Sequence, residues 1–530
     1  MATHPANSQT VKHAPSLWLL LVTFSSAAYW VFRYGLWFIE GDGVRLTLAA
    51  EGILHEGTLV TTNWTYGNGY GYQGLLAALS LIADVPILTF QLVGGLWLTV
   101  VIAAAFLAYQ KFLGGHRLAA AAAFLLLIQP DFIFYILRSS HEKTTWMYAL
   151  LLLWLWLKIP SFGRIQTKAA AVICIYLLLW GMIVNNAYLG STILTTFWIG
   201  ALVATIFKVA MPARLPVGVD ARFIQRLRFV PLTGTVLLFI FITFTYRPVI
   251  AYYGTLNSLV DRFVVVFIAG EDEILVEEPY CHLNPECKPV STRRGPYIQK
   301  GWVSGTAYLM LTSPQWGVVL LSLAAWVRDL FRMRELTTSR WLLWLFYTGF
   351  ITQLGLGVLI DLSGSLASNL QLRLFAPFAL MSSPLAATWL TYLPQQAPKR
   401  FVRLCTIVAA VLAITFALFK ASNEPLFANF WVYTSPREVA GVEWLETHVE
   451  DEFVWVDIWN HMKDALLLYN GYLWQRHNIY VVGNQDAPYI LTSDLTTAQA
   501  NRSPGIVLPS LIGRNRIYDN GTVQIYKIVP

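Results

Sequence analysis

Two carboxylates flank a glycine where the first long apolar segment of the chain ends. Glu40, Gly41 and Asp42 directly follow that segment, which covers residues 17–39. A carboxylate beside hydrocarbon loses hydration, so its charged form is costly unless a cation or a hydrogen-bond donor compensates it. Glu40 and Asp42 are therefore candidate acid–base groups at the edge of a membrane.

A second group of polar side chains fills a tight connection between two later apolar segments. Asp131 precedes it, and its members are Arg138, Ser139, Ser140, His141, Glu142 and Lys143. This density exceeds what a turn requires. The run offers a general acid or base in His141 or Glu142, a phosphate-binding cation and a metal ligand. The alternative is a network of ion pairs that only closes the loop.

The loop 40–74 also contains a stretch rich in glycine and aromatic residues, 63–72. Glycine lets the backbone approach a polar ligand, and rings such as those of Trp64 and Tyr66 can stack on the face of a sugar. The alternative is an anchor of Trp and Tyr side chains at the membrane surface. Earlier in the loop, the apolar pattern of 44–54 predicts a short helix on that surface.

Two arginines lie near the predicted outer ends of apolar segments, Arg247 and Arg373. An isolated Arg at the bilayer centre costs about 2.5 kcal/mol or more, but near the interface its side chain can reach out of the hydrocarbon. Either guanidinium could hold a lipid phosphate through two N–H donors. The alternative, which we prefer for Arg247, is contact with ordinary phospholipid.

The composition indicates an all-α polytopic membrane protein. Hydrophobic residues make up 56% of the chain, charged residues 13%, and mean hydropathy is +0.53. The first apolar segment is longer than the apolar part of a signal peptide and is expected to be retained. A spanning helix needs about 20 mostly apolar residues. Scanning for such runs predicts eleven spans, at 17–39, 91–110, 118–137, 144–158, 169–187, 189–208, 229–250, 303–326, 341–360, 370–393 and 404–420.

The charges of the connecting loops predict the orientation. Lys and Arg concentrate in short cytoplasmic loops, whereas acidic residues follow no such rule. With the N-terminus inside, the cytoplasmic loops receive clusters such as Arg328, Arg332, Arg334 and Arg340, and the outer loops 40–74, 131–143 and 251–302 receive most acids. The net charge of +7 is then inner-leaflet anchoring and indicates no nucleic-acid partner.

The composition changes after the last predicted span, which divides the chain into a membrane domain, 1–420, and an outer domain, 421–530. The second part has no apolar run long enough to span, and short apolar segments interleave with helical patterns such as 436–448. This indicates a small extracytoplasmic α/β domain. Asp519, Asn520 and Gly521 before the last strand are typical of a hairpin turn.

The four cysteines fall into two pairs with different expected roles. Cys174 and Cys405 lie within apolar spans and are expected to be small packing residues. Cys281 and Cys287 lie in the long loop placed outside, where a local disulfide could persist. A metal site with His282 is the alternative, but the spacing matches no standard zinc pattern, so we favour the disulfide.

Taken together, these features resemble the GT-C superfamily of membrane-embedded glycosyltransferases. The resemblance rests on an acidic motif directly after the first span, a polar motif in the second outer loop, an Arg-x-x-x-Pro stretch at Arg373 and Pro377, and the outer α/β domain. The ending 516–526 is also similar to the tail of prokaryotic members. In architecture the likeness covers nearly the whole chain, although its motifs comprise few residues.

The resemblance implies transfer of a sugar from a polyprenyl-phosphate-linked donor to a glycan, lipid or protein acceptor on the external face, usually with inversion at the anomeric carbon. Asp42 would be the general base, and Glu40 is its rival. His141, Glu142 and Lys143 correspond in position to the second motif. The candidate contacts of the donor phosphate are Arg138, Lys143, Arg247 and Arg373.

The departures from the family pattern limit what is carried over. The first motif is Glu-Gly-Asp instead of an adjacent Asp-Glu pair, and no Trp-Trp-Asp signature of oligosaccharyltransferases is found, which disfavours transfer to protein asparagine. No cofactor is firmly implied. A divalent cation is left open and not favoured, and a protein partner could bind through 421–530.

Two other classes of function remain open at this stage. A transporter or lipid flippase would explain eleven spans, but it should place ionisable residues near the membrane midplane on broken helices. A non-catalytic scaffold whose outer domain binds a partner is the third class. Replacing Asp42 by Asn without effect on cell-surface glycans would favour the scaffold.

Overall fold

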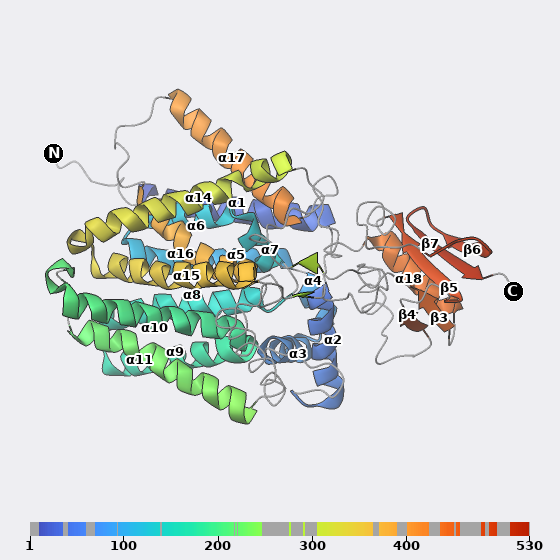
Figure 1. The fold of residues 1–530 in the computed structure, drawn as a ribbon, viewed down its shortest axis with the longest axis horizontal. Coiled ribbons are helices and arrows are strands. Elements are labelled where there is room, and N and C mark those ends of the chain that lie inside the picture. The colour runs from blue at the N-terminus through green and yellow to red at the C-terminus, as the bar shows by residue number, and fades with distance from the viewer. Residues whose placement is uncertain are drawn as a thin grey trace, which may run out of the picture.

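A computed structural model describes most of the membrane domain and parts of the C-terminal domain (Figure 1). The described residues are 10–34, 41–59, 69–92, 94–137, 140–216, 218–219, 221–245, 275–276, 290–291, 305–363, 370–389, 400–422, 435–449, 452–455, 479–482, 487–494 and 509–528.

Long helices form a bundle that makes up most of the molecule. They are α1 (Thr10–Tyr34), α5 (Gly94–Leu113), α6 (His116–Leu127), α8 (Glu142–Lys158), α9 (Ile165–Asn185), α10 (Ala187–Ala210), α11 (Ala221–Ile240), α14 (Gly305–Phe331), α15 (Thr338–Ser363), α16 (Leu370–Ala387) and α17 (Arg400–Ser422). Short turns of helix adjoin them: η1 (Ile159–Ser161), η2 (Pro212–Arg214), η3 (Phe241–Thr245) and η6 (Met333–Glu335).

Each of the eleven predicted spans coincides with one of these helices. Among the described residues, seven helices are long and apolar enough to cross a membrane, and a bent pair would make eight. Helices α1, α8 and α16 do not meet the same criterion over their described residues. A polytopic helical membrane fold is therefore confirmed, whereas the count of eleven stays a prediction.

The bent pair is α6 with α7 (Pro130–Leu137), whose axes differ by 79°. Pro130 has no backbone N–H to continue the helix, so the break follows from the sequence. The polar groups at the break find partners on other helices: Gln129 donates to Ser383 at 2.6 Å, and Asp131 accepts from Gln315 at 2.6 Å. Lys420 of α17 lies 3.9 Å from Asp131.

Three shorter helices gather at one end of the bundle: α2 (Gly41–Glu56), α3 (Gly71–Ala83) and α4 (Ile87–Leu92). Figure 1 shows them at the end that also faces the C-terminal sheet. Leu46, Tyr72, Leu76 and Ile87 form a separate apolar core among them. Helix α2 confirms the short helix predicted over 44–54. We call this end of the bundle the site end.

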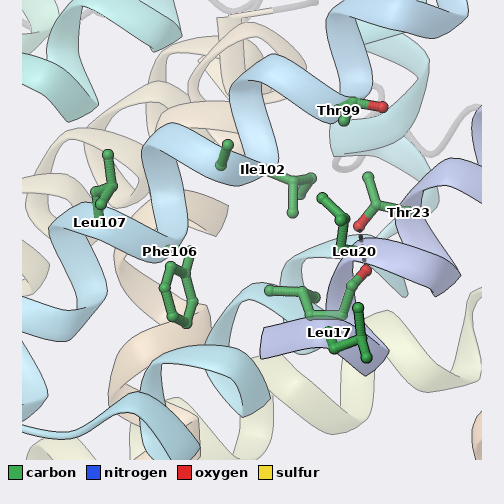
Figure 2. Close-up of a pocket in the computed structure, with 9 residues that line it drawn as sticks. Leu17, Leu20, Thr23, Thr99, Ile102, Phe106 and Leu107 are labelled. Atoms are coloured by element: carbon green, nitrogen blue, oxygen red, sulfur yellow. Dashed lines mark hydrogen bonds between the residues drawn. The ribbon is translucent and has the colours of Figure 1, made fainter. Parts of the chain in front are cut away.

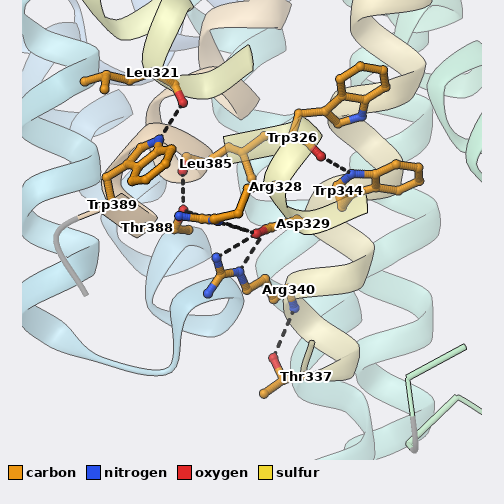
Figure 3. A network of polar contacts seen from close by, with 10 residues as sticks. All are labelled: Leu321, Trp326, Arg328, Asp329, Thr337, Arg340, Trp344, Leu385, Thr388 and Trp389. Atoms are coloured by element: carbon orange, nitrogen blue, oxygen red, sulfur yellow. Dashed lines mark hydrogen bonds and ion pairs between the residues drawn. The ribbon is translucent and has the colours of Figure 1, made fainter. Parts of the chain in front are cut away.

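The opposite end carries a buried ion cluster on α14, α15 and α16 (Figure 3). Asp329 is 1% exposed and accepts from Arg340 Nε and Nη2, each at 3.0 Å, and from Arg328 Nε at 2.9 Å. Arg328 also donates to Thr388 at 2.7 Å and lies over the ring of Trp389. Because a buried carboxylate requires such compensation, this cluster fixes the turn between α14 and α15.

The C-terminal part contains the predicted sheet. Its strands are β3 (Glu452–Trp455), β4 (Ile479–Val482), β5 (Tyr489–Ser493), β6 (Arg514–Asp519) and β7 (Val523–Ile528), in the order β4-β3-β5-β7-β6. The first three strands are parallel, and β7 runs antiparallel to β5 and β6. Helix α18 (Pro436–His448) matches the predicted helix and begins with a capping box between Ser435 and Glu438.

The predicted hairpin turn is also confirmed, because Gly521 has a φ of +82° and Asn520 accepts from the N–H groups of Thr522 and Val523. A further pair of short strands, β1 (Leu275–Val276) and β2 (Val290–Ser291), lies in the loop 251–302. Whether 421–530 is a domain with these boundaries stays a prediction.

Close helix packing at Gly349 gives a test of the bundle. A Cβ at Gly349 on α15 would lie 3.0 Å from the backbone of Thr196 on α10, whereas a Cβ at Gly355 would meet nothing within 4 Å. We expect Gly349→Ala to lower the free energy of unfolding by about 1–3 kcal/mol through overpacking. Gly355→Ala on the same helix should be neutral or stabilising, because Ala favours helix over Gly by about 1 kcal/mol. Thermal unfolding in detergent compares the two variants, and equal effects would contradict the packing.

Candidate functional site

Two consecutive amides at the junction of α9 and α10 hold the second polar motif in place. The side chain of Asn185 donates to the backbone carbonyl of His141 at 2.9 Å, and to the hydroxyls of Thr144 and Thr145 at 2.7 and 2.6 Å. All four residues are buried. The same carbonyl also accepts from the backbone N–H of Thr145 at 3.1 Å and from the hydroxyl of Thr144 at 2.9 Å. Asn185 therefore adds a donor from α9 to the start of α8, from which His141, Glu142 and Lys143 extend.

The neighbouring amide sets the chemistry of the His141 ring. Asn186 caps α10, because its Oδ1 accepts from the N–H of Leu189 at 2.8 Å. The NH2 group of Asn186 therefore faces the other way and contacts His141 Nε2. An NH2 group only donates, so Nε2 accepts, and the imidazole is neutral with its proton on Nδ1. His141 in this state does not act as a base through Nε2, and its Nδ1 is buried.

The same helix junction also contacts Gly69 and Gly71 at the end of the loop 40–74. A Cβ at Gly71 would lie 2.8 Å from the backbone N of Asn185, and one at Gly69, where φ is +157°, would lie 2.3 Å from the carbonyl O of Val184. Only glycine fits this approach. The sequence predicts that the backbone of this glycine-rich stretch approaches a ligand. At Gly69 and Gly71 it instead approaches the backbone of Val184 and Asn185.

A chain of buried hydrogen bonds then connects this loop to the start of α2. Tyr72 donates to Gln91 Oε1 at 2.6 Å, and Gln91 donates to Thr47 at 3.1 Å. Thr47 in turn donates to the carbonyl of Gly43 at 2.7 Å. Burial, and to a smaller extent the negative charge of Glu142, raise the pKa of Tyr72 well above its usual value. The phenol is therefore protonated and donates, as the hydrogen bond to Gln91 requires.

Glu142 and Lys143 lie where these two parts meet. Glu142 accepts from the hydroxyl of Ser140, and its other oxygen lies 3.9 Å from His141 Nε2. Lys143 is fully buried, with Nζ 5.5 Å from the ring of Tyr72 and 5.8 Å from that of Trp97. The carboxylate of Glu142 keeps about 12% of its side chain exposed. Glu142 is thus the acidic group of this motif that remains open to a ligand.

Of the remaining predicted site residues, Asp42 and Arg373 lie in the described part of the chain. Asp42 is the second residue of α2, directly before Gly43, whose carbonyl accepts from Gln91 at 3.5 Å. Arg373 lies in the first turn of α16 and is exposed, with no ion pair or hydrogen bond to another described residue. The predicted site residues outside the described part of the chain are Glu40, Trp64, Tyr66, Arg138, Arg247, Cys281 and Cys287.

The two cysteine predictions have different outcomes. Cys174 and Cys405 are free, as expected, but both are exposed on the surface of the bundle instead of packing inside it, which suits a lipid-facing position. The disulfide between Cys281 and Cys287 lies outside the described residues and stays a prediction. No group of three His, Cys, Asp or Glu side chains that could hold a metal occurs within the described ranges.

Sequence reasoning missed four residues of this site: Tyr72, Gln91, Asn185 and Asn186. Asn185 and Asn186 were detectable as adjacent amides at the end of an apolar segment, where unpartnered polar groups are costly. Tyr72 ends the glycine and aromatic stretch 63–72 that the sequence singled out, but its partnership with Gln91 depends on how α3 and α4 pack.

Comparison with known proteins identifies the fold. No protein-family model matches the chain, and no curated protein matches its sequence. Among solved structures, the apo oligosaccharyltransferase of Archaeoglobus fulgidus aligns with 93% of this chain and 71% of its own, at TM-score 0.58 and 11% identity. ArnT of Cupriavidus metallidurans bound to undecaprenyl phosphate aligns over 98% of both chains, at TM-score 0.50 and 11% identity. The chain has the GT-C fold.

A third structure is AglB from Archaeoglobus fulgidus in complex with an inhibitory peptide and a dolichol-phosphate. It covers 87% of this chain at TM-score 0.54 and 12% identity. The chain spans 64% of the length of that AglB structure. The GT-C resemblance inferred from the sequence is thus confirmed at the level of the fold.

A double-mutant cycle tests the tether to α2. Gln91→Leu leaves the buried hydroxyl of Tyr72 without its acceptor, so we expect a loss of about 1–3 kcal/mol in the free energy of unfolding. Tyr72→Phe should cost a similar amount. The double variant should lose less than the sum, because no polar atom of the pair is left unsatisfied. Additive losses in denaturant unfolding would show that the two side chains do not interact.

The pH dependence of stability tests the burial of α2. Desolvation raises the pKa of Glu51 above its usual value. A raised carboxyl pKa means that the folded state is favoured at low pH and loses that advantage as pH rises through the folded pKa. Glu51→Gln should therefore raise the melting temperature at pH 8, with a gain that shrinks as pH falls towards 4. An equal gain at both pH values would contradict the burial of this carboxyl.

Proposed function

We propose that the chain transfers a sugar from a polyprenyl-phosphate-linked donor to an acceptor on the external face of the membrane. The main support is the buried cluster of Glu142, Lys143 and His141 at the site end, which lies against Tyr72, the residue linked through Gln91 to the first turn of α2, where Asp42 is located. The fold adds support, since ArnT binds undecaprenyl phosphate and AglB binds a dolichol-phosphate in the structures with which the chain aligns.

In this proposal Asp42 is the general base. Its carboxylate takes the proton of the acceptor hydroxyl, the hydroxyl oxygen bonds to the anomeric carbon, and the bond from that carbon to the phosphate oxygen breaks with inversion. The electron pair leaves with the polyprenyl phosphate. Asp42 lies in the first turn of α2, where the helix dipole favours a carboxylate. Glu40 is the alternative base.

The second motif supplies the charge around the leaving group. Glu142 is the carboxylate, with 12% of its side chain exposed, and Lys143 adds a positive charge beneath the ring of Tyr72. The neutral His141 is buried beside them and contacts Asn186. Because Lys143 is fully buried, its positive charge stabilises the phosphate from a distance and does not contact it. An exposed cation such as Arg373 contacts the phosphate directly. Arg138 and Arg247 are further candidates.

We infer that the acceptor is a glycan or a lipid, since the signature expected for transfer to protein asparagine is missing from the sequence. The C-terminal domain is proposed to lie on the same external side, because Figure 1 shows its sheet beyond the site end of the bundle.

A second candidate function, transport of a lipid or polysaccharide, is favoured by one observation. The break between α6 and α7 carries Gln129 and Asp131, and transporters place polar groups on broken helices. However, Asp131 is held by Gln315 and Lys420. Because these partners satisfy the carboxylate within the bundle, Asp131 is better suited to a structural role than to binding a substrate that crosses the membrane.

The decisive assay supplies purified protein in nanodiscs with labelled polyprenyl-phosphate sugars and candidate acceptors. We expect release of polyprenyl phosphate, reduced at least a hundredfold by Asp42→Asn and about tenfold or more by Glu142→Gln, because each variant removes a charge used only during transfer. Asp494→Asn, an exposed carboxylate of the C-terminal domain, is the matched control and should retain full activity.

Two results would contradict the proposal. The first is movement of a labelled lipid across the bilayer without release of polyprenyl phosphate from any donor, which would favour the transporter. The second is unchanged activity in Asp42→Asn together with Glu40→Gln, which would place the base elsewhere.

A further inference from the structure

A pocket lies on the side of the bundle between α1 and α5 (Figure 2). It has a volume of about 460 Å³. It is lined by Leu17, Leu19, Leu20, Thr23, Thr99, Ile102, Ala103, Phe106 and Leu107. Only two lining side chains carry a polar atom, and one of these, the hydroxyl of Thr23, donates to the carbonyl of Leu19 at 2.8 Å. The pocket is therefore suited to a hydrocarbon chain.

Contacts along the seam between the two helices show where the pocket ends. Near the site end, Gly95 brings α5 against α1, since a Cβ there would lie 3.1 Å from the carbonyl of Ala27. The pocket begins beyond this contact and runs along α5 towards the turn that joins α5 to α6. It is thus separated from the candidate site, and its occupant is not the sugar donor proposed above.

Basic and polar side chains lie at the other end of the pocket. The ring of Phe106 is 6.1 Å from that of His116, and Gln110 lies 3.1 Å from His116 Nε2. Lys111 and Arg117 flank this pair, and neither forms an ion pair with a described residue. We call Gln110, Lys111, His116 and Arg117 the basic collar.

The surroundings of the collar leave room for an anion. A Cβ added at Gly114 or Gly115 would meet nothing within 4 Å, so the turn between α5 and α6 is open. The first turn of α6 has no acidic residue, and the helix dipole there favours an anion. An anionic group at the collar would therefore meet positive charge and donors on one side and open space on the other.

We infer that this seam is a binding site for one anionic phospholipid of the leaflet opposite the candidate site. One acyl chain lies in the pocket, and the phosphate lies at the basic collar. Charge complementarity at the collar distinguishes this occupant from a neutral lipid and from an apolar helix of a partner protein, neither of which would need Lys111 or Arg117. The inference is independent of the proposed sugar transfer.

Native mass spectrometry of the full chain in detergent tests the site with phosphatidylglycerol and phosphatidylcholine that carry identical acyl chains. We expect one molecule of phosphatidylglycerol to bind with an affinity at least tenfold above that of phosphatidylcholine. Lys111→Gln and Arg117→Gln should each lower the affinity for phosphatidylglycerol about fivefold, the effect of one basic residue near an anionic lipid, and leave that for phosphatidylcholine unchanged.

A pair of Phe variants tests the pocket itself. Ala103→Phe fills the pocket from an exposed position on α5 and should weaken both lipids, whereas Val236→Phe, 53% exposed on α11, should weaken neither. Both positions are on the surface, so both variants are expected to fold. Equal binding of the two lipids by the wild type, or equal effects of Ala103→Phe and Val236→Phe, would overturn the inference.

Discussion

The contacts that Asn185 makes with the start of α8 and with Gly71 are the interactions on which the candidate site depends. Polar groups inside an apolar bundle are tolerated only where protein groups satisfy them. The amide of Asn185 donates to the buried carbonyl of His141, which also accepts the backbone N–H of Thr145. Because Gly71 packs against the backbone of the same Asn185, one residue contacts both the loop 40–74 and the start of α8.

This arrangement explains why charged groups can be buried at one end of an apolar bundle. Lys143 is enclosed beneath two aromatic rings, and Glu142 is held by Ser140. Neither would be stable there unless the backbone around it were fixed. Burying this charged cluster lowers the free energy of unfolding, and the packing of the helices does not require the cluster. Clusters of this kind are typical of functional sites.

Sequence patterns predicted the elements well and their partners poorly. The apolar runs located the long helices, the pattern of 436–448 located α18, and Asn520-Gly521 located the hairpin, because these signals are local. The Tyr72 to Gln91 bond depends on how α3 packs against α4, and the neutral state of His141 depends on a cap 45 residues later. Such contacts between distant parts of the chain leave no periodic signal. The general base was inferred from a family resemblance and from position alone.

The central claim is that Asn185 joins the loops 40–74 and 131–143 into one site, and hydrogen–deuterium exchange of the Asn185→Leu variant tests it most directly. If the claim holds, amide exchange becomes faster in two separate segments, 141–146 of α8 and 69–76 around the start of α3, while 196–206 in the middle of α10 keeps its protection. Faster exchange in 141–146 alone, with 69–76 unchanged, would show that the loops are held independently and would contradict the claim.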